Sequence, residues 1–459
     1  MNEIFTAEEL SKIFDKSIHF GVQNLKTSSK DIKDGDLFIA IKGENVDGHD
    51  FVKEALDKGA VLAIVEKKLS GIDENRQIIV DSYQSALKKL AKFAVTRANS
   101  KIIGLTGSVG KTTTKDMLKH LLSKQENFKN SVHASEKNLN SQIGLPISAA
   151  RTPANTKISI FEMGMSAHGE IKNLIEIAPP KISLITTVCE THLKFFDSIF
   201  DIAKTKSEIF ETTVPQEFAV IPKDSPYADF LKEKAEKCGI KKIFSFGFAP
   251  NADIRILSYE FLDEGFKVFV NFVGEEVLYH LPCNNIAAIP NSAAAIFTAH
   301  LASDVSCKEL AAVIETFSPT HGRGELIHLQ KKNILVIDDS YNACPTSVRA
   351  AIQSMGRYKN RRKMLIFGDM GELGQGEVNF HRGLSPAIDK FGIDIVYTCG
   401  NLAKKLFDNL REEKKGQWFE NSAQAASEIS NLVQDGDCIL VKGSRFMKME
   451  LIVEALKNL

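Results

Sequence analysis

Residues Thr106 to Thr114 read T-G-S-V-G-K-T-T-T, and this stretch decides how the rest of the chain is interpreted. The apolar run Ile102 to Leu105 precedes it, and apolar residues at helical spacing, Met117 to Leu122, follow it. A strand that leads through a glycine loop into a helix is typical of a phosphate site, because backbone N–H groups converge at the helix N-terminus. Lys111 would supply a positive charge to the outer phosphates, and the Thr112 hydroxyl would bind magnesium.

The match to the standard phosphate-loop pattern is imperfect. The pattern G-x-x-x-x-G-K-T requires glycine at position 105, where this chain has Leu105, and Gly104 comes one residue too early. The alternative is an ordinary glycine turn before a helix. The strand and helix on either side favour nucleotide binding, with contacts predicted from Thr106, Gly107, Ser108, Val109, Gly110, Lys111, Thr112 and Thr113.

Length and composition limit the class of protein. A chain of 459 residues, 43% hydrophobic and 25% charged, predicts a globular protein of two to four domains. Lysine plus arginine and aspartate plus glutamate each total 58, so no net charge favours a nucleic-acid partner. No apolar run is long enough to span a membrane, and the acidic start M-N-E-I-F-T-A-E-E-L is unlike a signal peptide. Seven cysteines without a C-x-x-C pair indicate reduced thiols, and we expect a cytoplasmic protein.

The alternation of strand and helix patterns predicts three α/β units, at residues 1–98, 99–318 and 319–459. The central unit should contain a mainly parallel sheet covered on both faces, because helices fall between its strands at 158–162, 182–188, 219–222 and 243–246. Residues 253–281 differ and predict antiparallel strands, after which a helix at 291–302 returns to the sheet. A break near Ser318-Pro319 leads into the third unit, whose strands are expected at 334–337, 364–367, 395–398 and 438–441.

Three further titratable residues are considered as site candidates, each with an ordinary structural alternative. Glu162 ends the strand I-S-I-F-E, where a carboxylate would face the glycine loop and hold magnesium, but it could equally be a solvated or capping glutamate. His192 follows a strand, although a lone histidine is more often structural, and an imidazole ligand would also tolerate Mn²⁺. Lys206 lies in a helical stretch with Lys204, where lysines are ordinarily solvated.

The order and context of Thr106 to Thr113, Glu162, His192 and Lys206 resemble those of the Mur ligases, ATP-dependent amino-acid ligases of peptidoglycan precursor synthesis. The resemblance implies the three-domain architecture of that family, with a central P-loop domain and a Rossmann-like C-terminal domain. It also implies ATP and Mg²⁺ as cofactors, with Thr112, Glu162, His192 and Lys206 as metal ligands. In that family the lysine before S-E-I-F is carbamylated, which implies a carbamate on Lys206.

Motifs at both ends of the chain narrow the activity within the family. The segment 34–51 is similar to the type that binds UDP-muramoyl peptides in the last two ligases of the series. The C-terminal stretches I-D-D-S-Y-N-A-C-P-T-S (337–347), G-D-M-G-E-L-G (368–374) and V-K-G-S-R-F-M-K-M-E (441–450) resemble the member that adds D-alanyl-D-alanine to UDP-N-acetylmuramoyl-tripeptide. The preceding, diamino-acid-adding ligase carries a D-N-P-R motif that this chain lacks. Two alternatives remain, that ligase and a non-catalytic nucleotide switch.

The resemblance also assigns individual residues. It implies catalytic roles for Lys111, Glu162, His192, Lys206 and Arg323. Arg323 is expected near the ATP phosphates, Asp339 near the ribose or adenine, and Asn291, opening a helix, at the adenine. Contacts to UDP-tripeptide or dipeptide are expected from Ser29, Lys30, Lys42, Asp47, His49, Asn138, Asn140, Tyr341 and Asn342. We expect a monomer.

The chain departs from the family pattern at three places. Ala287-Ala288 replaces the usual histidine-asparagine pair before Asn291, which leaves the adenine contacts open. Ser28-Ser29-Lys30 replaces D-S-R, so the uridine side loses an aspartate and the bidentate fork of an arginine. Cys344 replaces the second asparagine of N-A-N-P, and a thiol is a weaker hydrogen-bonding group.

Overall fold

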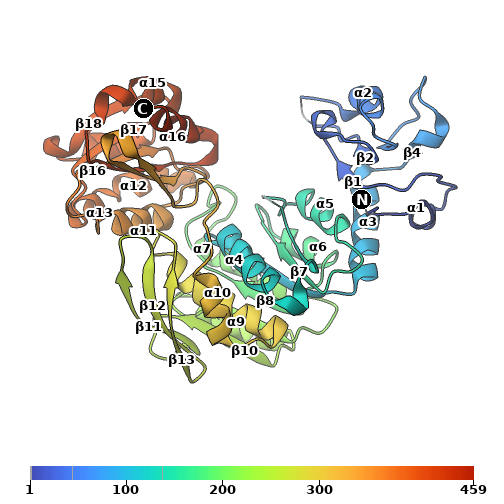
Figure 1. The fold of residues 1–459 in the computed structure, drawn as a ribbon, viewed down its shortest axis with the longest axis horizontal. Coiled ribbons are helices and arrows are strands. Elements are labelled where there is room, and N and C mark those ends of the chain that lie inside the picture. The colour runs from blue at the N-terminus through green and yellow to red at the C-terminus, as the bar shows by residue number, and fades with distance from the viewer. Residues whose placement is uncertain (1–2, 44, 137) are drawn as a thin grey trace.

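The computed structural model describes residues 3–43, 45–136 and 138–459 and contains three β-sheets, each built from one part of the chain. The central sheet lies at the base of the view in Figure 1, and the N-terminal and C-terminal sheets lie above it on opposite sides. The predicted α/β class with mainly parallel sheets is confirmed. Among the described residues, no helix has the length and apolar character needed to cross a membrane.

The N-terminal sheet is parallel throughout, with the order β1-β2-β3-β4. Its strands are β1 (Asn24–Lys26), β2 (Asp36–Ile39), β3 (Leu62–Val65) and β4 (Gln77–Ile79), and its helices are α1 (Ala7–Phe14), α2 (Val52–Asp57) and α3 (Tyr83–Ala98). Because α3 packs against α5 (Gly144–Ala150) of the next unit, it holds the N-terminal sheet to the central one.

The central sheet has the strand order β13-β12-β11-β10-β9-β8-β5-β7-β6. The strands from β5 to β10 are parallel, whereas β11, β12 and β13 pair antiparallel, as predicted. These three extend the same sheet, because β11 pairs with β10. The strands are β5 (Lys101–Thr106), β6 (Val132–Ala134), β7 (Ile158–Glu162), β8 (Ile182–Ile185), β9 (Phe218–Pro222), β10 (Lys242–Gly247), β11 (Ile254–Phe261), β12 (Phe266–Phe272) and β13 (Glu275–Leu281).

Helices cover both faces of the central sheet, which explains why β5, β7, β8 and β9 are buried along almost their whole length. One face packs against α4, α9 and α10, and the other against α5, α6 and α8. The helices of this unit are α4 (Lys111–Ser123), α5, α6 (Glu170–Ile175), α7 (Ile199–Ser207), α8 (Ala228–Lys237), α9 (Ala288–Ser303) and α10 (Cys307–Ile314).

The C-terminal sheet has the order β14-β15-β19-β16-β17-β18, with only β14 antiparallel. Its strands are β14 (Glu325–Leu329), β15 (Ile334–Asp339), β16 (Lys363–Gly368), β17 (Ile395–Cys399), β18 (Lys415–Phe419) and β19 (Cys438–Lys442). Helices again cover both faces: α11 (Pro345–Met355), α12 (Glu377–Arg382), α13 (Ser385–Lys390), α14 (Ala403–Asn409), α15 (Ser422–Leu432) and α16 (Glu450–Lys457).

Two predicted boundaries were wrong. The strand expected at 182–188 ends at Ile185, because the following residues turn to bond with the glycine loop: Thr187 O accepts from Ser108 N at 2.7 Å. The helix expected to open at Asn291 begins at Ala288, so Asn291 lies one turn inside α9.

Candidate functional site

The glycine loop joins the end of β5 to the start of α4 and requires glycine at two positions. Gly107 has φ +152° and Gly110, the N-cap of α4, has φ +85°, values that side-chain-bearing residues rarely adopt. A Cβ atom at Gly110 would collide with the Asn291 amide, and one at Gly107 with the Thr186 hydroxyl. The loop therefore has the close backbone packing of a phosphate site, and Asn291 lies directly against it.

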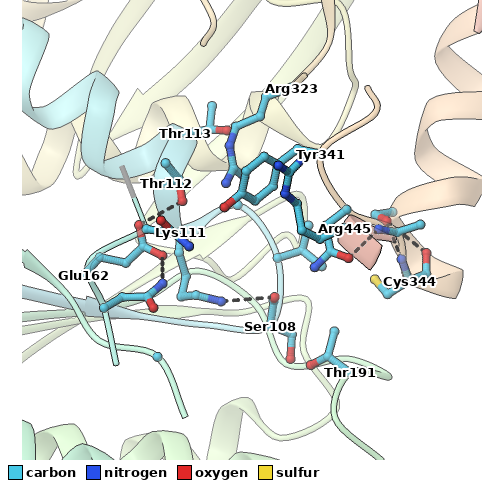
Figure 2. A pocket seen from close by; sticks show the side chains of 18 of the residues that line it. Ser108, Lys111, Thr112, Thr113, Glu162, Thr191, Arg323, Tyr341, Cys344 and Arg445 are labelled. Carbon is cyan, nitrogen blue, oxygen red and sulfur yellow. Dashed lines mark hydrogen bonds between the residues drawn. The ribbon is translucent and has the colours of Figure 1, made fainter. Parts of the chain in front are cut away.

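Lys111 is the first residue of α4, and its side chain bends back over the loop. Its Nζ donates to the carbonyl oxygens of Gly107 at 2.7 Å and Ser108 at 3.4 Å. Figure 2 shows the bond to Ser108. Burial lowers the pKa of Lys111, and the charge of Glu162 opposes that shift. The ammonium is thus held over the loop on which a nucleotide phosphate would lie.

Glu162 ends β7 at the bottom of the site and is 1% exposed. Its Oε2 accepts a hydrogen bond from Thr112 Oγ1 at 2.9 Å, and its Oε1 accepts one from Asn140 Nδ2 at 2.6 Å. Figure 2 shows the Thr112 and Glu162 side chains directed at each other. The predicted magnesium ligands Thr112 and Glu162 are therefore neighbours, and both offer the oxygen atoms that Mg²⁺ prefers.

Lys206, in the last turn of α7, is 2% exposed, and its side chain reaches the same cavity. Burial holds its pKa well below the usual lysine range, and the charge of Lys111 adds to this effect. No carboxylate among the described residues forms an ion pair with it. Burial without a counter-charge favours the uncharged amine over the ammonium, and the uncharged amine is the reactive form of this group.

His192 reaches the site from the loop after β8 and contacts the C-terminal unit. Its Nδ1 lies 2.5 Å from Glu372 Oε2. With Nδ1 occupied in this way, Nε2 is the ring nitrogen left for another partner.

The C-terminal unit contributes a cation–aromatic pair and a buried ion pair. The Arg323 guanidinium lies 4.1 Å from the centre of the Tyr341 ring. The two side chains lie next to each other in Figure 2. Lys442 Nζ lies 2.6 Å from Asp339 Oδ2, and both side chains are buried. Burial raises the pKa of Asp339, against the opposing effect of Lys442.

The charged and aromatic side chains described above line one cavity of about 880 Å³ between the central and C-terminal units. The structure brings into it most of the predicted site: Ser108, Val109, Gly110, Lys111, Thr112, Thr113, Asn138, Asn140, Glu162, His192, Lys206, Asn291, Arg323, Asp339, Tyr341 and Asn342. Residues from two separately folded sheets thus face one space large enough for a small-molecule ligand.

The remaining predicted residues do not line this cavity. Thr106 is fully buried beneath the loop, and Gly107 shapes the loop from behind. The five residues expected to bind the uridine end, Ser29, Lys30, Lys42, Asp47 and His49, lie in the N-terminal unit. His49 is 6% exposed, and both ring nitrogens are engaged: Nδ1 lies 2.6 Å from Asp47 Oδ1, and Nε2 accepts from Glu66 N at 2.9 Å. In this structure the His49 ring packs within the unit.

The sequence reasoning missed several cavity residues of the C-terminal unit, including Glu372, Lys442, Ser444, Arg445 and Phe446. All five lie in the motifs at 368–374 and 441–450. Those motifs could have identified these residues as part of the site, although the motifs alone do not say what each residue does.

The chemistry of these side chains fits a nucleotide and a divalent cation. The loop supplies backbone N–H groups and Lys111, while Thr112 and Glu162 supply hard oxygen atoms. No group of three histidine, cysteine, aspartate or glutamate side chains in the described ranges has metal-binding geometry. A cation would therefore depend on phosphate oxygens, water or a modified lysine to complete its coordination.

Three family models match successive parts of the chain. They are described as Mur ligase family, catalytic domain (residues 21–95), Mur ligase middle domain (105–299) and Mur ligase, glutamate ligase domain (322–445).

Relatives match over nearly the full length. A UDP-N-acetylmuramoyl-tripeptide–D-alanyl-D-alanine ligase of Rickettsia prowazekii is 36% identical, covering 93% of each chain. A crystal structure of MurF from Acinetobacter baumannii superposes with a TM-score of 0.87 at 29% identity, covering 99% of each chain. The MurF ligase of Thermotoga maritima in complex with ADP has a TM-score of 0.80 at 28% identity, covering 95% of this chain and 97% of that one.

Proposed function

We propose, from the premise that this chain belongs to the Mur ligase family, that it joins D-alanyl-D-alanine to UDP-N-acetylmuramoyl-tripeptide with hydrolysis of ATP. The observation that carries the proposal is the shared cavity, where Lys111, Thr112 and Glu162 of one unit face Arg323 and Tyr341 of another. Full-length similarity to ligases of this specificity favours it over the diamino-acid-adding reaction. The enzyme would catalyse the last cytoplasmic ligase step of peptidoglycan precursor synthesis.

The reaction proceeds in three steps. The terminal carboxylate of the tripeptide attacks the γ-phosphorus of ATP, which forms an acyl phosphate and releases ADP. The amine of D-alanyl-D-alanine then attacks the acyl carbon to give a tetrahedral intermediate. Phosphate leaves as the peptide bond forms, and the amine proton passes to solvent. Catalysis of this kind rests mainly on placement of the reactants and neutralisation of charge.

The residues facing the cavity have distinct roles in this scheme. Lys111 and Arg323 offset the negative charge of the phosphate being transferred, because both cations face the same space. The loop residues 106–113 bind the phosphates. Asn291, which lies against Gly110, and Asp339, which pairs with Lys442, bind the remainder of the nucleotide. Since Ala287 and Ala288 offer no polar side chain, the base depends on other contacts.

Mg²⁺ fits the oxygen atoms of Thr112 and Glu162, with His192 Nε2 and Lys206 as further ligands, and Mn²⁺ would suit the imidazole. When bound, the cation would neutralise phosphate charge. Lys206 would act as a carbamate: its neutral amine adds CO₂ and loses a proton, which converts a potential cation into an anion. The support is its burial without a counter-charge.

The substrates are assigned to the units as follows. Residues 1–98 bind the UDP end through Ser29, Lys30, Lys42, Asp47 and His49, residues 99–318 bind ATP, and residues 319–459 bring the dipeptide. Asn138, Asn140, Tyr341 and Asn342 contact the peptide substrates, supported by their place in the cavity wall. The three sheets and the three family matches support these boundaries. We further propose a monomeric cytoplasmic enzyme, to which the seven free thiols are suited.

The deciding experiment measures phosphate release with ATP and each acceptor alone, then with both, and with a panel of amino acids in place of the dipeptide. The proposed ligase releases phosphate at full rate only with tripeptide and D-alanyl-D-alanine together. A nucleotide switch would bind ATP without consuming it under any of these conditions. Preference for a diamino acid over the dipeptide would instead assign the preceding ligase reaction.

A further inference from the structure

Two cysteines from different units meet at the edge of the cavity. Cys189 belongs to the loop after β8 in the central unit, and Cys344 is the N-cap of α11 in the C-terminal unit. Both are buried, with 8% and 5% of their surface exposed, and their thiols are in hydrogen-bonding contact. This thiol pair therefore bridges the two halves of the candidate site.

The backbone on each side of the pair is fixed by hydrogen bonds. Ser108 Oγ donates to Cys189 O at 3.1 Å, and Cys344 N donates to Ser347 Oγ at 3.0 Å. Next to the pair, Thr346 Oγ1 donates to Glu190 Oε2 at 2.6 Å, a second direct contact between the same two segments. The two sulfur atoms are therefore held together by their surroundings.

The other five cysteines do not share this arrangement. All seven are free, but among the residues that the structure describes only Cys189 and Cys344 have another thiol as a partner. In reducing compartments disulfides are mostly transient and respond to oxidation. A pair of reduced thiols at a domain interface is therefore suited to reversible disulfide formation.

We propose that Cys189 and Cys344 form a reversible oxidation site, in which a disulfide between them fastens the C-terminal unit to the ATP-binding unit and stops turnover. A ligase that exchanges substrates and products between two units must let those units separate. A covalent bond beside the cavity would prevent that separation.

The oxidant is a hydroperoxide, of which hydrogen peroxide is small enough to reach Cys344 from the cavity that this residue lines. Figure 2 shows Cys344 at the edge of the pocket, beside the start of the helix that follows it. The hydrogen bond from Cys189 lowers the pKa of Cys344, whereas that of Cys189 is raised, so Cys344 is the first nucleophile.

The chemistry then balances in two steps. The Cys344 thiolate attacks one peroxide oxygen, the O–O bond breaks, and a sulfenic acid and hydroxide form. The sulfur of Cys189 attacks the sulfenic sulfur, the S–O bond breaks, and a second hydroxide leaves and takes up the Cys189 proton. With the Cys344 proton included, two thiols and one hydrogen peroxide give one disulfide and two waters. A dithiol reductant reverses the reaction by exchange.

The test treats the intact enzyme with hydrogen peroxide, blocks the remaining thiols, and maps non-reduced peptides by mass spectrometry while phosphate release is followed. We expect a cross-linked peptide containing Cys189 and Cys344, loss of most activity, and recovery of both with dithiothreitol. Peptide mapping does not depend on the assigned reaction, so failure of the proposed function would leave this readout intact.

For the variants Cys344→Ser and Cys189→Ala, the phosphate-release rate after peroxide treatment is compared with the rate of the same variant before treatment. Each variant should keep most of its activity. Cys399→Ser, which removes a buried, unpaired thiol of the same C-terminal unit, should remain as sensitive as the unsubstituted enzyme. If Cys344→Ser does not fold, Cys344→Asn serves in its place. Inactivation without the cross-link, a cross-linked enzyme of full activity, or equal sensitivity of Cys344→Ser would each overturn the proposal.

Discussion

His192 Nδ1 lies 2.5 Å from Glu372 Oε2, which joins the central unit directly to the C-terminal unit. A backbone bond runs alongside, since Lys194 N donates to Glu372 O at 3.0 Å. Both residues adopt a left-handed backbone conformation, with φ +57° for His192 and φ +60° for Glu372, which is uncommon for side chains of their size. The contact therefore depends on the two loops meeting in this arrangement.

Replacing Glu372 by alanine should weaken this docking without unfolding either unit. A half-exposed polar contact of this kind contributes about 0.5–1 kcal/mol, so we expect kcat/KM to fall about two- to fivefold. Steady-state phosphate release measures the effect, and Glu420→Ala, an exposed carboxylate of the same unit, is the control. Equal kinetics for the two variants would show that the contact does not assist catalysis.

Replacing Lys111 by alanine should nearly abolish turnover. The ammonium lies over the glycine loop, and loss of one well-placed charge typically reduces kcat about a hundred- to a thousandfold. Phosphate release and the melting temperature are measured together, with the exposed Lys119→Ala on the same helix as the control. Full activity of a normally folded Lys111→Ala enzyme would be incompatible with the phosphate-loop assignment.

Glu162→Gln should raise the magnesium concentration required for half-maximal activity. An amide oxygen can still accept from Thr112 but carries no negative charge for the cation. Chelation followed by magnesium titration compares this variant with Glu176→Gln, which alters an exposed carboxylate. The same magnesium requirement in both variants would exclude Glu162 as a ligand.

Lys206→Ala should nearly eliminate ligation, and added acetate or formate should restore part of it by returning an anion to the vacated space. Lys204→Ala is the matched control, because that exposed lysine pairs with Asp201 on the surface and its loss should change stability by only about 0.5 kcal/mol. Both variants are assayed with and without the acids at fixed ionic strength. A fully active Lys206→Ala enzyme, or an inactive Lys204→Ala one that acetate rescues, would contradict the assignment.

His381 should make the stability of the C-terminal unit depend on pH. Its ring is fully buried, Nδ1 donates to Glu377 O at 2.6 Å, and Nε2 accepts from Met370 N at 2.9 Å, so only the neutral form keeps both bonds. Burial lowers the pKa of His381 below the value of 6.5 expected for the unfolded chain. Below that pH the unfolded chain binds more protons than the folded protein does. The free energy of unfolding therefore decreases as the pH is lowered from about 6.5, until the folded pKa is reached.

The expected slope for this one group is at most about 1.4 kcal/mol per pH unit. Denaturant unfolding at a series of pH values below about 6.5 measures it. His381→Gln should flatten the dependence, while the exposed His19→Gln should leave it as in the unsubstituted protein. Burial also lowers the pKa values of His120 and His133, so part of the slope will remain. If the free energy of unfolding of His381→Gln depends on pH as steeply as that of the unsubstituted protein, the pH dependence comes from other groups.

The sequence by itself determined the family, the three α/β units and the part of the cavity wall that contains the glycine loop. These features are local or ordered along the chain: the glycine loop T-G-S-V-G-K-T-T-T specifies its own backbone, and the apolar runs specify buried parallel strands. The early start of α9 and the early end of β8 escaped prediction, and at β8 a contact with the glycine loop sets the boundary.

Only the tertiary structure decided which distant residues meet. His192 and Glu372, and likewise Cys189 and Cys344, lie on different units, and no periodicity in the chain relates their positions. Burial also emerges only after folding: Lys206 reads as a solvated helix lysine like Lys204, and packing alone removes its solvent and lowers its pKa. Residue types and their local order follow from the sequence, whereas contact and desolvation depend on how the three sheets pack together.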